Sequence, residues 1–163
     1  MVLTSIMDLK YGNADRVSRA AGALSRAVLR GDANFEDEYK MADAVFDILK
    51  ECVPFEDFKR EAAANLAVMM LSSGTESMCG KATGILAHFL EDRQGYMQGI
   101  AIFKRAFGQC SAQRKGMIRG KLMETKSNYP GSPMLVRNLE FVIFASRMRT
   151  DRACIGNGQR PLY

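Results

Sequence analysis

Residues 74–82, with the sequence GTESMCGKA, come closest of any segment to the pattern of a phosphate-binding loop. They follow the apolar run at residues 66–71 and precede a predicted helix, as the loop of a nucleotide-binding protein does. However, Gly74 and Gly80 stand one residue too far apart, and Ala82 replaces the Ser or Thr that would hold magnesium. We therefore interpret this segment as a turn between helices.

The other polar residues give little support for general acid–base or nucleophilic catalysis. His88 is the only histidine, and no acid and nucleophile stand at a spacing that would complete a catalytic triad around it. The carboxylate pairs at 56–57 and 91–92 are adjacent residues, whose side chains point in different directions on a helix. We expect a protein without catalytic residues, in which His88 is packed or on the surface.

The four cysteines, Cys52, Cys79, Cys110 and Cys154, are widely spaced and form no C-x-x-C pair. With a single histidine to assist them they do not match a zinc site, and we expect neither a metal nor a cofactor. The chain begins MVLTSIM, without the basic and apolar regions of a secretory signal, and its apolar runs are far shorter than the roughly 20 residues of a membrane span. These features predict an intracellular protein with free, buried thiols.

Charge is distributed unevenly along the chain. Residues 1–92 carry 10 Lys or Arg and 15 Asp or Glu, whereas residues 93–163 carry 13 Lys or Arg and only 3 Asp or Glu. A cation-rich half with few acidic neighbours is typical of a surface that binds phosphate, either in a nucleic acid or on an anionic membrane. The alternative is that the acidic half docks against the basic half and that the charges are otherwise solvated.

Aromatic residues among these cations favour single-stranded RNA over duplex DNA. Tyr96, Phe103, Phe107 and Tyr129 could stack on unpaired bases, and the sequence has no helix-turn-helix, zinc-finger or basic-zipper pattern to read a major groove. Phe103 and Phe107 share one face of a predicted helix and better fit core packing, which leaves Tyr129 as the stacking candidate. The predicted contacts with RNA, without sequence preference, are Lys104, Arg105, Arg114, Lys115, Arg119, Lys121, Lys126 and Tyr129.

Helical periodicity of apolar residues recurs along most of the chain and defines the elements that would position these side chains. It predicts helices over residues 14–30, 35–52, 55–72, 76–92, 96–109, 111–125 and 134–149. Asn13 or Asp15 is expected to cap the first helix, Gly31 to end it, and Ser111 to cap the most basic helix, which we place on the phosphate backbone. Residues 139–144 (LEFVIF) would also suit a strand, although length and spacing favour a helix.

Together these elements predict an all-α protein, a compact bundle of about six or seven helices that forms one domain over residues 1–149. Within it, residues 1–92 are the acidic half and residues 93–149 the basic half. Residues 126–133 (KSNYPGSP) read as an exposed loop, because two prolines and a glycine cannot continue a helix. Residues 150–163 are expected to form an extended C-terminal arm that could wrap a partner subunit, and we find no internal repeat.

Three segments of the second half, residues 102–107 (IFKRAF), 111–118 (SAQRKGMI) and 138–147 (NLEFVIFASR), resemble in order and type a stretch of the orthomyxovirus nucleoproteins. In that family an apolar-basic helix leads into an A-Q-K-A-M-like turn, a loop with Pro and Gly, and a helix of the form D-L-x-F-L-A-R. A second placement is also possible. Residues 84–86 (GIL) through 103–105 (FKR) resemble part of the helical N-terminal domain of an orthomyxovirus matrix protein, whose length this chain matches better.

Both resemblances imply an all-helical, basic, self-associating viral protein that touches RNA or a membrane surface. They imply the cytoplasm or nucleus of a host cell, or the virion, as its location, and Arg114, Lys115 and Arg119 as its RNA contacts. Our leading interpretation is a non-enzymatic protein that binds RNA and assembles into homo-oligomers. The alternative is a matrix or adaptor protein whose basic face meets an anionic membrane or a protein partner.

Overall fold

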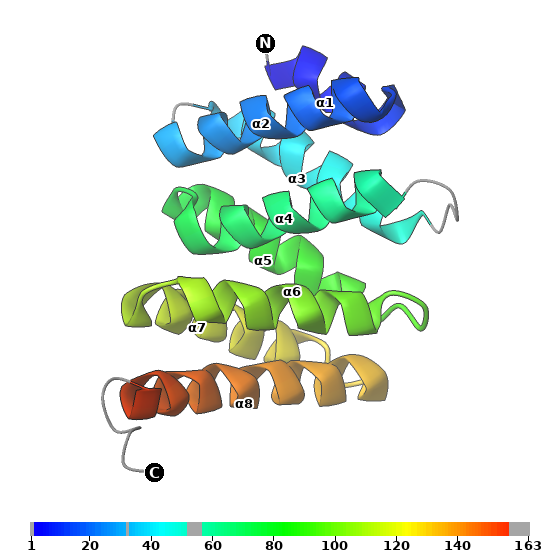
Figure 1. Ribbon diagram of the computed structural model, residues 1–163. Helices are drawn as coiled ribbons and strands as arrows, with labels where there is room; N and C mark the ends of the chain where they lie inside the picture. Colours follow the sequence, from blue (N-terminus) through cyan, green and yellow to red (C-terminus); the bar gives the residue numbers. More distant parts are fainter. Residues whose placement is uncertain (1, 32, 52–56, 157–163) are drawn as a thin grey trace.

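The computed structural model describes residues 2–31, 33–51 and 57–156, with side chains as far as residue 147. These residues form eight α-helices joined by short connections (Figure 1). The helices are α1 (Val2–Tyr11), α2 (Ala14–Arg30), α3 (Phe35–Lys50), α4 (Asp57–Ser73), α5 (Glu76–Phe89), α6 (Tyr96–Gln109), α7 (Ala112–Asn128) and α8 (Pro133–Gly156). In this part of the chain no helix combines the length and the apolar character needed to cross a membrane.

The helices are arranged as a two-layer stack (Figure 1). The even layer consists of α2, α4, α6 and α8, and the odd layer of α1, α3, α5 and α7. Within each layer a helix packs on the helix two positions further along, and contacts such as α1–α2, α3–α4 and α7–α8 join the layers. Solenoid proteins stack pairs of helices in the same way, so that each unit contacts only its neighbours.

Short polar side chains determine where several helices begin. Asn13, Asn34, Thr75 and Ser111 each accept a hydrogen bond from the backbone N–H three residues ahead, at 2.8–3.1 Å. At its other end α2 stops at Gly31, whose φ of 67° lies in the left-handed region that residues with a side chain rarely adopt. The predictions that Asn13 or Asp15 caps α2, that Gly31 ends it and that Ser111 caps α7 are therefore confirmed, with Asn13 as the cap of α2.

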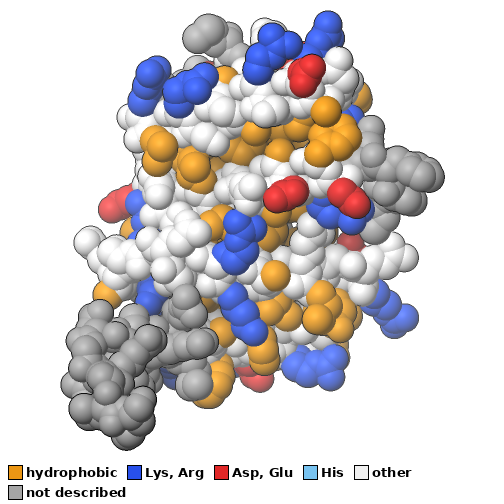
Figure 2. Space-filling view, in the orientation of Figure 1, with side chains coloured by type: hydrophobic (Ala, Val, Ile, Leu, Met, Phe, Trp, Pro, Cys, Tyr) orange, Lys and Arg blue, Asp and Glu red, His pale blue; other side chains and the backbone are white. Residues whose placement is uncertain are grey.

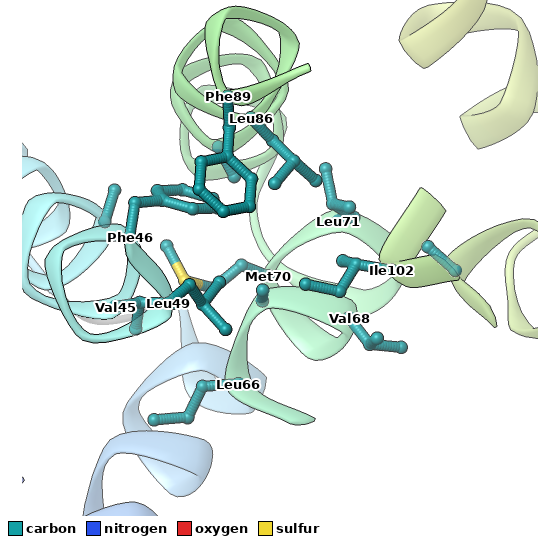
Figure 3. Close-up of a cluster of buried hydrophobic side chains, with 14 of the residues drawn as sticks. Val45, Phe46, Leu49, Leu66, Val68, Met70, Leu71, Leu86, Phe89 and Ile102 are labelled. Carbon is teal, nitrogen blue, oxygen red and sulfur yellow. The ribbon is translucent and has the colours of Figure 1, made fainter. Parts of the chain in front are cut away.

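One continuous cluster of buried apolar side chains lies between the two layers. Figure 3 shows part of this cluster, in which α3 contributes Phe46 and Leu49, α4 contributes Met70 and α5 contributes Phe89. Ile102 extends the cluster into α6 (Figure 3). Because every helix contributes to this cluster, the apolar face of each helix is set by the neighbours on which it packs in the stack.

The structure confirms the all-α class and all seven helices predicted from the periodicity, but the described residues contain eight helices rather than six or seven. Residues 139–144 lie within α8, so the strand alternative is excluded. Most helix ends agree with the prediction to within about two residues, but some differ by more. α5 ends at Phe89 rather than at residue 92, and α7 continues through residues 126–128, which the composition had assigned to the loop before Pro133.

α1 is the helix that the sequence analysis did not predict. It has 10 residues, and a helix that short is marginal by itself. It is held by packing on α2 and α3, with Ile6 and Leu9 buried against them. Tertiary contact, rather than local sequence, therefore explains why this segment is helical.

The extended arm expected from Thr150 is wrong for residues 150–156, which continue α8 as far as Gly156. Residues 149–155 (RTDRACI) contain neither proline nor glycine, so each added residue extends an existing helix and gains one backbone hydrogen bond. The remainder of the expected arm, residues 157–163, lies outside the described residues.

Asn138 joins the beginning of α8 to the end of α5, and we predict that this link stabilises the stack. Its buried amide donates a 2.8 Å hydrogen bond to the carbonyl oxygen of Leu90. Asn138→Leu leaves that carbonyl without its donor and should lower the free energy of unfolding by about 1–3 kcal/mol. Ser132→Ala removes an exposed 2.7 Å bond to Glu91 and should cost less than about 1 kcal/mol. Urea denaturation followed by circular dichroism measures both; equal losses would contradict the prediction.

Candidate nucleic-acid interface

Four arginines, Arg16, Arg19, Arg26 and Arg30, share one exposed stripe of α2, which we call the arginine row. Their spacing of three or four residues, with Ala23 filling the step between Arg19 and Arg26, repeats about every turn of the helix. At 1.5 Å per residue the row spans roughly 21 Å. Val17, Ala20, Leu24 and Val28 occupy the opposite, buried side. The strong amphipathic pattern of α2 therefore fixes the arginines on the outside of the even layer.

The arginine row is not neutralised by neighbouring groups. Within the part of the chain that the structure describes, none of the four guanidinium groups has a hydrogen-bond or ion-pair partner, and Asp15 is the one acidic residue of α2. Figure 2 shows Lys and Arg side chains gathered over α2, whereas the acidic side chains on this face lie mainly over α4. A stripe of unpaired guanidinium groups attracts polyanions, because each group presents a planar fork of donors to phosphate.

Lys104 and Arg105 of α6 are exposed in the same layer and are positioned by neutral groups. The ammonium nitrogen of Lys104 lies 4.8 Å from the ring centroid of Phe141 on α8, and a guanidinium nitrogen of Arg105 donates a 2.6 Å hydrogen bond to Asn65 Oδ1 on α4. A phenyl ring and an amide orient these cations without cancelling their charge. The structure thus places two of the predicted RNA contacts on the face that also carries the arginine row.

The three α7 residues at the centre of the sequence prediction, Arg114, Lys115 and Arg119, are used for packing. Lys115 is only 6% exposed. Arg114 is half-buried and its guanidinium points to the carbonyl oxygen of Leu71, at 3.4 Å, while Arg119 donates a 3.0 Å hydrogen bond to Ser146 of α8. A sequence signal for Lys115 was present, because it shares the stripe of Ile118 and Leu122 that faces the core.

The remaining predicted contacts lie at separate places. Lys121 is exposed and lines a shallow groove between α5 and α7, and Lys126 forms a 3.0 Å ion pair with Glu140. Tyr129 is exposed after α7, where its ring packs edge-on against that of His88 with 5.1 Å between centroids. The eight predicted residues therefore do not converge on one surface, and Lys104 and Arg105 are the two that lie exposed in the same layer as the arginine row.

Five ion pairs in the part of the chain that the structure describes each connect two residues of the same half. Within the acidic half they are Lys10–Asp47, Lys40–Glu36, Arg60–Asp57 and Lys81–Glu38, and in the basic half Lys126 pairs with Glu140. The pair of Glu36 and Lys40 is fully exposed, and its hydrogen bond lowers the pKa of the carboxyl and raises that of the ammonium. Arg105 and Arg114 of the basic half reach the acidic half, where they donate hydrogen bonds to neutral acceptors, the side chain of Asn65 and the carbonyl oxygen of Leu71.

Of the phosphate-loop-like segment, residues 74–75 form the predicted turn between helices, whereas residues 76–82 already belong to α5. Thr75 caps α5, and the loop ends within the first turns of that helix. Lys81, which would contact phosphate in a nucleotide-binding loop, lies 3.4 Å from a carboxylate oxygen of the buried Glu38 and 3.4 Å from the centroid of the Phe35 ring. In the described residues no three His, Cys, Asp or Glu side chains are grouped as metal ligands.

Cys110 follows the last residue of α6, and the pKa of its thiol responds to the positive charges at the start of α7. Burial raises the pKa of its half-buried thiol above the ordinary value, because the thiolate would be poorly solvated. The positive charges of Lys115 and Arg114 oppose this shift and favour the thiolate. Cys110 thus provides a chemical probe of whether Lys115 is charged and turned inward.

No protein-family model, curated protein or solved structure matches the chain. The resemblance to orthomyxovirus proteins therefore stays a prediction. What the fold and the charges define together is a class: an all-α, two-layer helical stack with a basic even layer.

The sequence analysis did not include the arginine row among the predicted RNA contacts. The three-and-four spacing of Arg16, Arg19, Arg26 and Arg30 was visible, but counting net charge by halves assigned α2 to the acidic half. The acidic residues that dominate that count lie mostly on other helices, such as Glu36, Asp37 and Glu38 on α3.

We predict that Arg119 contributes to stability and that Lys121, two residues away on the same helix, does not. Arg119→Ala removes the charged donor to Ser146 and should lower the free energy of unfolding by about 1–2 kcal/mol. Lys121→Ala removes an exposed charge and should change it by less than about 0.5 kcal/mol. Urea denaturation curves of the two variants provide the comparison, and a larger loss for Lys121→Ala would count against the placement of α7.

We also predict that Lys115→Met slows the alkylation of Cys110. Removal of the positive charge leaves burial less opposed, so the pKa of Cys110 rises further and the thiolate fraction at a given pH falls. Iodoacetamide labelling across a pH series, quantified by mass spectrometry of the Cys110 peptide, should show the rate curve displaced to higher pH. Lys121→Met serves as the control and should leave the curve in place; coincident curves for all three proteins would refute the prediction.

Proposed function

We propose that this protein is a non-enzymatic RNA-binding and assembly protein that holds single-stranded RNA on the even layer without sequence preference. The observation that carries the proposal is the arginine row: four exposed guanidinium groups in line on α2, without acidic partners in the described structure. Exposed, flexible cations contact phosphate and displace its counterions, which gives affinity that depends on salt and little on base sequence.

Lys104, Arg105 and the neighbouring ring of Phe141 support the same proposal from α6 and α8. Phe141 is half-exposed and Lys104 lies over its face. Exposed aromatic rings beside cations are typical of proteins that bind single strands, because an unpaired base can stack on the ring while its phosphate meets the cation. The arginine row would thus hold the backbone, with Lys104, Arg105 and Phe141 as a second point of contact two helices away.

The alternative function, a matrix or adaptor protein, uses the same cations on a different surface. Leu29 is 61% exposed on α2 between Arg26 and Arg30, and a basic helix with an exposed apolar side chain can also bind an anionic lipid surface. RNA is favoured because Lys104 and Arg105 add cations and a stacking ring on the same face.

We predict that Arg26→Ala/Arg30→Ala weakens RNA binding far more than Lys40→Ala/Lys50→Ala, which removes the same charge from α3 in the odd layer. Fluorescence anisotropy of a labelled single-stranded RNA, titrated at several salt concentrations, measures both. Loss of two phosphate contacts should weaken binding about tenfold at low salt and reduce the slope of log K against log salt by about 1.4, since a single strand gives about 0.7 per contact.

Two results would contradict this proposal in different ways. If both double variants lose affinity equally, binding follows net charge and the arginine row is not the contact surface. If the wild-type protein does not bind RNA at low salt but binds vesicles containing phosphatidylserine, the basic face belongs to a membrane-binding protein. Vesicle co-sedimentation with the same three proteins gives that second comparison.

A further inference from the structure

Both ends of the stack expose apolar side chains, which is unusual for an array of this kind. Stacked helical proteins that are soluble as single chains carry terminal units with a polar outer face, because a bare end repeats the surface that neighbouring units bury. Here α1 forms one end, and α7 with α8 forms the other (Figure 1). Each end therefore offers a surface on which another helix can pack.

The outer side of α1 is an apolar stripe made of Leu3, Met7 and Tyr11. These residues stand four apart, so they line one face of the helix, and all three are exposed. Ile6 and Leu9 on the other side are buried against α2 and α3. α1 is thus apolar on two faces, of which only one is packed.

The opposite end carries a groove of about 390 Å³ between α7 and α8. Its apolar lining is Met123 of α7 with Ile143 and Phe144 of α8, and Phe144 is 59% exposed. Lys126, Glu140 and Arg147 lie around these side chains. An apolar floor with charged residues at its rim is the usual form of a groove that accepts an amphipathic helix.

The groove occupies the position that the next helix of the odd layer would take. In this stack α5 packs on α3, the preceding odd helix, and also on α4. A helix that packed on α7 and α8 together would have the arrangement that α5 has with α3 and α4, and the groove is lined by side chains of α7 and α8. The groove therefore offers a second helix the same two-sided packing that α5 receives from α3 and α4.

We propose that α1 of a second copy of this chain occupies the groove, so that copies join head to tail. α1 is itself an odd-layer helix, and its exposed Leu3–Met7–Tyr11 stripe can cover the apolar lining of the groove. The charges at the edges are complementary. Asp8 adjoins the stripe on α1, and Arg147 at the rim of the groove has no ion-pair partner in the described structure.

Such a contact joins two different surfaces, so each added copy leaves one α1 and one groove free. Contacts of this type give rings when the rotation closes and open helical filaments when it does not. The helix that inserts has only 10 residues, so we expect association that rises with protein concentration rather than a permanent dimer. The proposal does not require RNA and can fail or hold independently of the proposed function.

Sedimentation velocity of the RNA-free protein over a range of concentrations tests the contact. Met7→Glu alters the α1 stripe and leaves the groove intact, whereas Phe144→Glu alters the groove and leaves α1 intact. Each variant alone should remain monomeric at concentrations where the wild-type protein forms dimers and larger species. An equimolar mixture of the two should form a dimer and nothing larger, because one intact α1 meets one intact groove.

Met97→Glu, at an exposed methionine of α6 in the middle of the stack, is the matched control and should assemble like the wild-type protein. Circular dichroism confirms that each variant is folded. A variant that still dimerises alone would indicate contacts between like ends and overturn the proposal. A wild-type chain that is monomeric at every concentration also overturns it. If deletion of residues 157–163 then produces assemblies, that result would indicate that the chain's own C-terminal residues occupy the groove.

Discussion

The contact of each helix with the helix two positions further along the chain is the constraint on which the other features of this protein depend. It divides the helices into an even and an odd layer and places one apolar cluster between them. Each helix must bury a face toward its partners in the stack, and the face that remains is the one available to other molecules. The arginine row is available because Val17, Ala20, Leu24 and Val28 turn the other side of α2 inward. The exposed stripe of α1 and the groove between α7 and α8 have the same origin, because these helices lie at the two ends of the described stack.

Two groups of cations with different roles result from this arrangement. The long side chains of Arg114, Lys115 and Arg119 lie between helices, where their charged ends meet protein groups and their stems cover apolar surface. Lys104 and Arg105 are held by a ring and an amide and keep their charge exposed. A count of positive charge along the sequence does not separate these groups, although a polyanion can reach only the second.

Local pattern was sufficient to predict most of the elements of this fold. Apolar spacing identified α2 to α8, and the preferences of Asn13, Gly31 and Ser111 located the ends of particular helices. α1 was missed because its helical state depends on burial of Ile6 and Leu9 against distant residues. The site was harder to predict, since exposure of a cation depends on which neighbour covers the polar side of its helix. For Arg119 that neighbour is Ser146, 27 residues away, and no periodicity in α7 reveals it.

The restriction of contacts to nearby helices also bears on how the chain reaches its fold. Most helix contacts join elements that are one or two positions apart along the chain. The hydrogen bond from Asn138 to Leu90, which spans 48 residues, is an exception. Proteins with such local contacts fold quickly, because little loop entropy is lost before the first contacts form. During synthesis, α1 to α3 can pack together while the later helices are still being made. The stack can therefore form from its N-terminal end during translation, because each new helix packs on helices that have already been made.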